Sequence, residues 1–276
     1  MSSQRRPRRW LPLAAVLFGL AMVTTGCQSN AFTRQGLPVP VTKQGQVILH
    51  MWQGSWIAAW AVGIVVWGGI LWAIIFHRKR GNQLPQQVRY NLPIEILYTV
   101  LPFIMVGVLF YFTARDENYI NRLPGSHQQH LVVDVTGFQW SWQFQYPQFK
   151  VTSANGTTAP VTETGAMWSP TATVQHMPLL EIPTGEVVKF NLTSIDVVHA
   201  FWIVPFEFKR DVIPGYANHF AVTAIKTGTF IGRCTELCGV YHSRMLFTVK
   251  IVTPAQFKQW IHRQQALQSS ASGGVQ

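Results

Sequence analysis

The sequence predicts a protein in two parts, an α-helical hairpin that crosses a membrane and an all-β sandwich or barrel outside it. The first observation is a run of 20 residues without a charge from Ile57 to Phe76. The second is another apolar span, from about Pro93 to Phe112, whose one acid is Glu95. Either run is long enough to cross the ~30 Å hydrocarbon layer of a bilayer as a helix. The third is a change, after residue 113, to short segments with period-two alternation, which is typical of strands.

The net charge of +11 is distributed unevenly between these parts. Residues 1–113 carry +9, whereas residues 114–276 carry +2. Basic residues gather in the loop between the two spans, in "HRKR" (His77–Arg80) and at Arg89. The positive-inside rule predicts that this loop is cytoplasmic, so the β domain and both chain ends lie outside. Because the basic excess belongs to the membrane part, membrane lipid is an expected partner and nucleic acid is not.

Residues 1–26 have the pattern of an export signal. Basic residues at Arg5–Arg9 precede an apolar core from Leu11 to Val23, and small residues end in "TTGC". Cleavage before Cys27 with lipid on its sulfur is one hypothesis, although the usual lipoprotein signal has Leu where this chain has Thr24. Ordinary signal cleavage and a retained helix are the alternatives. Digestion and intact-mass analysis distinguish them, because only the first leaves a lipid on Cys27.

The remaining elements follow in order along the chain. A polar lead-in covers residues 27–51, the hairpin residues 52–113, the β domain residues 114–253, and a closing helix with a loose tail residues 254–276. The closing helix is expected over Pro254–Gln268. Val151–Thr173 is expected to be a surface excursion between strands. The predicted strands are His130–Tyr146, Gly185–Ser194, His199–Val204, His219–Ile225, Gly228–Cys234 and Met245–Val252.

The segment "GRCTELCGVYHSRMLFTV" contains four side chains that can bind a soft metal. They are Cys234, Cys238, His242 and Met245, in a chain with only three cysteines. An exported domain favours disulfides, so a Cys234–Cys238 bridge is the first alternative. A bridge, however, needs neither histidine nor methionine, whereas thiolate, imidazole and thioether together are the ligands that copper prefers. His199, at the start of the predicted strand "HAFWIV", can supply a further ligand.

The segment "CTELCGVYHSRM" resembles the C-x-E-x-C-G-x-x-H-x-x-M loop of the subunit II family of cytochrome c oxidases. Further matches are "DVVHAFWIVP", "KRDVIPG", "GFQWSWQFQY" and "NLPIEILYTVLP", and the similarity covers about residues 45–265 in the same order. The resemblance implies a cupredoxin-like domain that holds a binuclear, mixed-valence copper centre, CuA. It implies that Cys234 and Cys238 bridge two copper ions and that His199 and His242 each bind one. It also makes Met245 a weak axial ligand of one copper and the backbone carbonyl of Glu236 that of the other.

The resemblance implies roles for three more side chains, and each has a simpler explanation. The carboxylate of Glu236 corresponds to a ligand of a magnesium ion shared with subunit I, but it can also be a solvated loop acid. Trp140 aligns with the tryptophan that receives electrons in this family. The simpler explanation is core packing, because alternate residues of one predicted strand form an aromatic face: Phe138, Trp140, Trp142, Phe144 and Tyr146. Glu95 matches a glutamate at the mouth of a proton pathway in subunit I, or it is simply an acid favoured at a helix start.

The expected function is therefore that of subunit II of a bacterial haem–copper cytochrome c oxidase. By resemblance, it accepts electrons from cytochrome c at CuA and passes them to haem in subunit I, where oxygen is reduced to water and protons are pumped. The expected partners are subunits I and III and either cytochrome c or a tethered haem c domain, in the bacterial cell membrane with the CuA domain on the outer face. The alternatives are a membrane-tethered copper chaperone or thiol reductase, and a quinol oxidase subunit II, which lacks the copper ligands.

Overall fold

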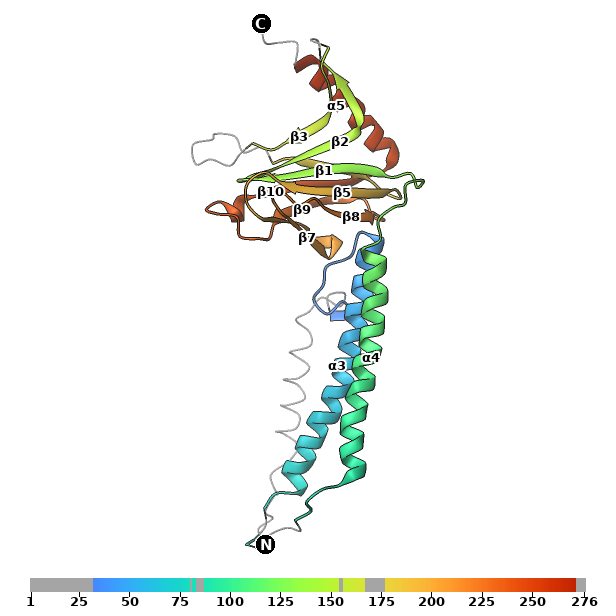
Figure 1. The fold of residues 1–276 in the computed structure, drawn as a ribbon, viewed down its shortest axis with the longest axis vertical. Coiled ribbons are helices and arrows are strands. Elements are labelled where there is room, and N and C mark those ends of the chain that lie inside the picture. Colours follow the sequence, from blue (N-terminus) through green and yellow to red (C-terminus); the bar gives the residue numbers. More distant parts are fainter. Residues whose placement is uncertain (1–31, 80, 83–86, 154–155, 167–176, 272–276) are drawn as a thin grey trace, which may run out of the picture. The chain divides into compact units, whose positions relative to one another are not determined.

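The computed structural model describes residues 32–79, 81–82, 87–153, 156–166 and 177–271 (Figure 1). The predicted signal over residues 1–26, the Cys27 lipid site and the last five residues of the tail lie outside this part of the chain. The described residues from Val39 onwards form one compact unit. In it, two long helices precede an all-β domain, so the predicted fold class is confirmed.

Helices α3 (Lys43–Phe76) and α4 (Leu92–Ile120) form the hairpin, and both are long and apolar enough to cross a membrane. Both helices extend beyond the predicted apolar spans. Helix α3 begins at Lys43 because the Thr42 hydroxyl accepts a hydrogen bond from the Gly45 N–H at 2.9 Å, which caps the first turn. Helix α4 begins after Asn91, whose side chain accepts from the Ile94 N–H, and continues to Ile120.

The outer ends of the helices are joined to the β domain by hydrogen bonds. Thr42 forms a bridge with Ala224, and the Gln44 side chain accepts from the Thr223 N–H at 3.0 Å. At the end of α4, Asn121 accepts a hydrogen bond from the Arg210 guanidinium. The polar residues just outside each apolar span therefore connect the hairpin to the sheets.

The β domain is a sandwich of two five-stranded sheets. One sheet has the order β3-β2-β1-β5-β8 and the other the order β4-β10-β9-β6-β7. Neighbours pair antiparallel except β1 with β5 and β4 with β10, which are parallel. The strands are β1 (Leu131–Phe138), β2 (Ser141–Thr152), β3 (Thr158–Thr164), β4 (Leu179–Pro183), β5 (Val187–Ser194), β6 (His199–Ile203), β7 (Phe208–Val212), β8 (Asn218–Thr223), β9 (Gly228–Cys234) and β10 (Leu246–Val252).

Two features of the sandwich differ from the sequence prediction. Strand β3 lies within the segment predicted as a surface excursion. It buries only Val161 fully, and its hydrogen-bonded pairing with β2 holds it in the sheet. The single strand predicted over His130–Tyr146 is two strands, β1 and β2, joined at Gln139 and Trp140. Phe138 pairs with Ser141 across this hairpin, so it lies on the sheet face opposite to Trp142. The predicted common face is therefore wrong for Phe138.

The core between the sheets is aromatic, and it extends to the predicted metal ligands. Phe201 and Phe247 stack with ring centroids 4.9 Å apart, and Phe144 packs edge-on against Phe247 at 5.3 Å. Helix α5 (Pro254–Ala271) covers one end of this core. His199 and Met245 are 0% exposed. Any metal bound by these two side chains would therefore lie at the edge of the rigid interior and not on a mobile surface loop.

Tyr146 links the two sheets at the α5 end of the core. Its hydroxyl donates to the Glu181 carbonyl at 2.9 Å and accepts from the Glu181 N–H at 3.1 Å, which joins β2 to β4. Trp260 of α5 packs edge-on against the Tyr146 ring at 5.2 Å. Burial raises the pKa of Tyr146, so the hydroxyl stays protonated and keeps both bonds.

Candidate metal centre

Three strand ends bring the predicted ligands together. Cys234 is the last residue of β9, His199 is the first residue of β6, and Phe201 of β6 pairs with Cys234. The loop that follows β9 contains Cys238 and a 3₁₀ turn, His242–Arg244, and returns to β10 at Met245. Its two ends are held together because the Cys234 N–H donates to the Met245 carbonyl at 3.0 Å.

The side-chain donors of this loop converge on one small region. The Sγ atoms of Cys234 and Cys238 lie 3.8 Å apart, and both cysteines are free. His199 Nδ1 is 3.8 Å from Cys234 Sγ. His242 Nδ1 and Met245 Sδ are 3.5 and 3.8 Å from Cys238 Sγ. The donor atoms of His199, Cys234 and Cys238 all lie within 4.8 Å of one another, so this group could hold a metal ion.

The donor set fits a soft or borderline metal ion such as copper. Two thiols, two imidazoles and a thioether are soft or borderline ligands, which select copper over magnesium or calcium. The Glu236 carbonyl lies 3.2 Å from Cys234 Sγ, while the Glu236 carboxylate belongs to an exposed residue. The carbonyl is therefore part of the cluster, and the carboxylate is available to a partner at the surface.

The two thiols have different acidities. Burial raises the pKa of Cys234, but hydrogen bonds with His199 and with the Ala200 and Glu236 backbone outweigh it and lower the pKa to about 7. Burial, together with the charge of Cys234, raises the pKa of Cys238 to about 12. The pair of thiols therefore loses its first proton more readily than its second, and the positive charge of a bound metal would favour the loss of both.

Asp196 orients the His199 ring. Its Oδ1 lies 2.9 Å from His199 Nε2, which leaves Nδ1 directed towards Cys234. Burial favours the neutral imidazole, but hydrogen bonds with Cys234 and Asp196 outweigh it and raise the pKa of His199. A carboxylate on the far nitrogen of a ligating histidine fixes its tautomer and orientation. Sequence reasoning assigned no role to Asp196; the available signal was an acid three residues before His199.

Trp140 lies against the ligand loop from the neighbouring sheet. It is half-buried in the turn between β1 and β2, and its Nε1–H donates to the Cys238 carbonyl at 3.2 Å. The Gln139 side-chain amide donates to the same carbonyl at 2.8 Å. Asp196 Oδ2 accepts from the Gln139 N–H at 2.6 Å, so this turn is tied to the ligand region at two points.

Glu95 lies apart from this cluster, in the first turn of α4. Its Oε1 accepts a hydrogen bond from the Asn91 N–H at 2.9 Å, while the Asn91 side chain accepts from the Ile94 N–H. This reciprocal arrangement is similar to a capping box, with the acid one residue further along the helix. The side chain therefore has a structural role at the helix start, whether or not it has another.

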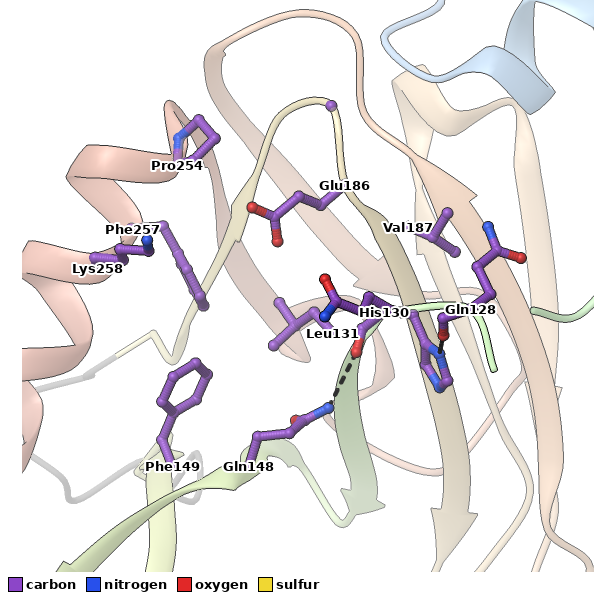
Figure 2. Close-up of a pocket in the computed structure, with 12 residues that line it drawn as sticks. Gln128, His130, Leu131, Gln148, Phe149, Glu186, Val187, Pro254, Phe257 and Lys258 are labelled. Atoms are coloured by element: carbon purple, nitrogen blue, oxygen red, sulfur yellow. Dashed lines mark hydrogen bonds between the residues drawn. The ribbon is translucent and has the colours of Figure 1, made fainter. Parts of the chain in front are cut away.

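A separate hollow of about 670 Å³ lies at the other end of strand β1 (Figure 2). Leu131 at the start of β1 and Phe257 of α5 contribute to its wall, and Gln148 donates to the His130 carbonyl at 3.2 Å. None of the described residues that line it is a predicted ligand. Because β1 runs from this hollow to the turn that carries Trp140, the hollow is no part of the metal centre.

The β-sandwich, the cluster of sulfur and imidazole donors, and the two apolar helices define a class of protein: a cupredoxin-like domain with a candidate metal site, joined to a helical hairpin. Comparison with known sequences identifies the family. The sequence model described as "Cytochrome C oxidase subunit II, periplasmic domain" matches residues 131–252. The chain is 46% identical over 285 residues to a probable cytochrome c oxidase subunit 2 of Streptomyces avermitilis, covering 93% of this chain and 88% of that protein. The chain belongs to the cytochrome c oxidase subunit II family.

Other relatives agree. A probable cytochrome c oxidase subunit 2 of Streptomyces coelicolor is 44% identical, covering 99% of this chain and 92% of that one. Cytochrome c oxidase subunit 2 of Mycobacterium tuberculosis is 34% identical, covering 94% and 82%. The crystal structure of the periplasmic domain of subunit II of cytochrome oxidase of Bradyrhizobium japonicum is 29% identical in sequence. The alignment covers 52% of this chain and 98% of that one, with a TM-score of 0.41. The relatives in sequence confirm, at the level of the family, the resemblance inferred from the sequence motifs.

Proposed function

We propose that this chain receives electrons from a haem c protein at a binuclear CuA centre and delivers them to haem in subunit I of a proton-pumping oxidase. The observation that supports this most is the convergence of two thiols, two imidazoles and a thioether at the end of β9. Cys234 and Cys238 would hold both coppers between them, His199 and His242 would each hold one, and Met245 and the Glu236 carbonyl would be the weak ligands.

When bound, a pair of copper ions that share two thiolates takes up and releases one electron with little change in geometry. The chain's own residues contribute orientation and exclusion of water. Asp196 keeps His199 Nδ1 directed at the sulfur atoms, and the aromatic core behind Met245 keeps solvent away from the inner side. Trp140, hydrogen-bonded to Cys238, offers a half-buried indole to a donor at the surface.

Copper analysis of the purified chain tests this proposal. We expect two coppers per chain and a purple colour, because a mixed-valence pair bridged by thiolates absorbs visible light. Colourless protein with a Cys234–Cys238 disulfide after copper reconstitution would refute it and favour a thiol-based role. The chaperone or thiol reductase alternative is not favoured, since its usual fold is α/β and the described domain consists of two β-sheets packed together.

The proposal extends to location and partners. The basic loop between α3 and α4 supports a cytoplasmic turn of the hairpin and a β domain on the outer face of the bacterial membrane. Apolar side chains exposed along both helices would face lipid and subunits I and III. The exposed Glu236 carboxylate would meet subunit I and share a magnesium ion with it, because an oxygen ligand from each side suits that hard cation.

Glu95→Gln is expected to slow oxidase turnover by about a hundredfold, the lower end of what proton-transfer groups contribute. The glutamine can still accept the Asn91 N–H, so the helix cap is kept while the charge is removed. Copper loading and CuA reduction should stay intact, because Glu95 is at the cytoplasmic end of the hairpin. The measurement is steady-state turnover across pH, with Glu117→Gln at the other end of α4 as the control. A normal rate at every pH would leave Glu95 with the capping role alone.

The electron donor is expected to be a neutral or acidic cytochrome c, or a haem c domain held nearby by a membrane anchor or a complex. Residues 114–276 sum to +2, so they exert little long-range attraction on a basic soluble donor. A tethered donor needs little intrinsic affinity, because tethering raises the effective concentration to roughly millimolar.

Turnover with a soluble basic cytochrome c should therefore be slow and change little with ionic strength. The matching measurement is copurification of a haem c protein with the oxidase in mild detergent. Fast turnover that salt inhibits steeply, with no haem c protein in the preparation, would contradict the tethered-donor hypothesis.

A further inference from the structure

The indole of Trp140 is held on three sides. Its Nε1–H donates to the Cys238 carbonyl, and its ring meets the Tyr241 ring edge-to-face, with centroids 4.8 Å apart and planes at 84°. On the third side, a Cβ at Gly239 would lie 3.1 Å from Trp140 Cζ2 and Nε1, so glycine leaves the space that the indole fills. Two of these contacts come from Gly239 and Tyr241, which lie between the ligands Cys238 and His242 in sequence.

The hydrogen bond alone does not keep the indole in place. The Cys238 carbonyl also accepts from the Gln139 amide at the shorter distance of 2.8 Å, so it stays hydrogen-bonded if the indole turns away. The indole is half-buried, and its own N–H could find water outside. Packing contacts therefore hold the observed orientation, and the edge-to-face contact with Tyr241 is the one that the ligand loop itself supplies through a side chain.

We infer that Tyr241 is a positioning residue that holds the indole of Trp140 on the Cys238 carbonyl, so that electron transfer into the centre depends on Tyr241 through Trp140. This inference rests on the proposed function, in which Trp140 receives the electron. Electron transfer through a hydrogen bond requires the donor ring to stay within bonding distance of the ligand backbone. Tyr241 directly precedes His242 and is four residues before Met245, so it belongs to the ligand loop. Its ring therefore fixes the position of the indole relative to the ligands.

The test compares Tyr241→Leu and Tyr241→Phe in the purified oxidase. Copper content, the visible spectrum and the reduction potential of CuA are measured first. Reduction of CuA by reduced soluble cytochrome c is then followed by stopped flow over a range of donor concentrations. We expect Tyr241→Leu to keep two coppers and an unchanged potential. The limiting rate should fall by about tenfold to a hundredfold, since displacement of a reacting group by about 1 Å can cost about a hundredfold. Tyr241→Phe, which keeps the ring, should retain a rate close to that of the unaltered protein.

Two controls make the test specific. Val240→Ala truncates a side chain in the same loop that is 82% exposed, and it should leave the limiting rate unchanged. In a Trp140→Phe background, Tyr241→Leu should cause no further loss, because two residues that act through one contact are not additive. A donor-docking role for Tyr241 would instead raise the half-saturating donor concentration and leave the limiting rate alone.

Several results would overturn the inference. For Tyr241→Leu, they are an unchanged limiting rate, loss of copper, or a raised half-saturating donor concentration as the only effect. An equal slowing in Val240→Ala would also overturn it, as would a further slowing when Tyr241→Leu is added to Trp140→Phe. Failure of the proposed function looks different, because then the unaltered chain itself would not hold two coppers. If the unaltered chain holds copper and Trp140→Phe slows reduction while Tyr241→Leu does not, only the role of Tyr241 is lost.

Discussion

Cys234→Ser and Cys238→Ser are each expected to abolish the binuclear copper centre. The two sulfur atoms lie 3.8 Å apart with one imidazole beside each, an arrangement that suits two metal ions held between two thiolates. One remaining thiolate cannot bridge both coppers symmetrically, and a serine hydroxyl is a harder, far less acidic donor. Copper should fall from two per chain to one or none, and the mixed-valence spectrum should disappear. Copper analysis and electron paramagnetic resonance measure both effects.

Met245→Leu is the matched comparison for the cysteine variants. Met245 is fully buried in the core, and leucine conserves its volume, so the fold should tolerate the change. Its sulfur lies 3.8 Å from Cys238 Sγ, where it would act as a weak axial ligand that mainly tunes the potential. We expect copper to be retained and the reduction potential to shift. Equal and complete loss of copper in all three variants would contradict this ranking of the ligands.

The parts of the molecule that could be predicted from the sequence have signals that lie close together in the chain. The hairpin follows from two uninterrupted apolar runs, and the ligand loop from four side chains within twelve residues, Cys234–Met245. Strand β3 was missed because its signal is not local: it depends on pairing with β2 and buries only Val161 fully. The beginning of α3 could not be predicted from the apolar run, which starts at Ile57. The helix begins at Lys43, because the Thr42 hydroxyl caps its first turn.

The surroundings of the metal centre could not be read from the sequence for the same reason. Asp196 contacts the Gln139 backbone 57 residues away, and Trp140 contacts the Cys238 carbonyl 98 residues away. The Asp196 contact arises where the end of β5 lies beside β1 in the same sheet. The Trp140 contact arises only when the β1–β2 turn of one sheet is brought against the β9–β10 loop of the other. The ligand types are thus local in sequence, while the groups that orient them come from the packing of the sandwich.

Trp140→Phe is expected to retain copper and to slow electron transfer from cytochrome c into the centre by orders of magnitude. Phenylalanine keeps an aromatic ring in the turn but lacks the Nε1–H that bonds the Cys238 carbonyl. That carbonyl keeps the Gln139 amide as a donor, so the ligand loop itself should not rearrange. The measurement is single-turnover reduction of CuA, with copper content and potential determined on the same samples.

Trp142→Phe is the control that separates the two tryptophans of this hairpin. Trp142 is 0% exposed and packs against Phe201 and Phe247, so its replacement removes core volume and should lower the thermal stability of the domain. In the protein that remains folded, CuA should still be reduced at nearly the original rate, because Trp142 has no surface at which a donor could dock. The opposite pattern, with Trp140→Phe reduced at an unchanged rate, would remove Trp140 from the electron path and with it the need for Tyr241 to hold the indole.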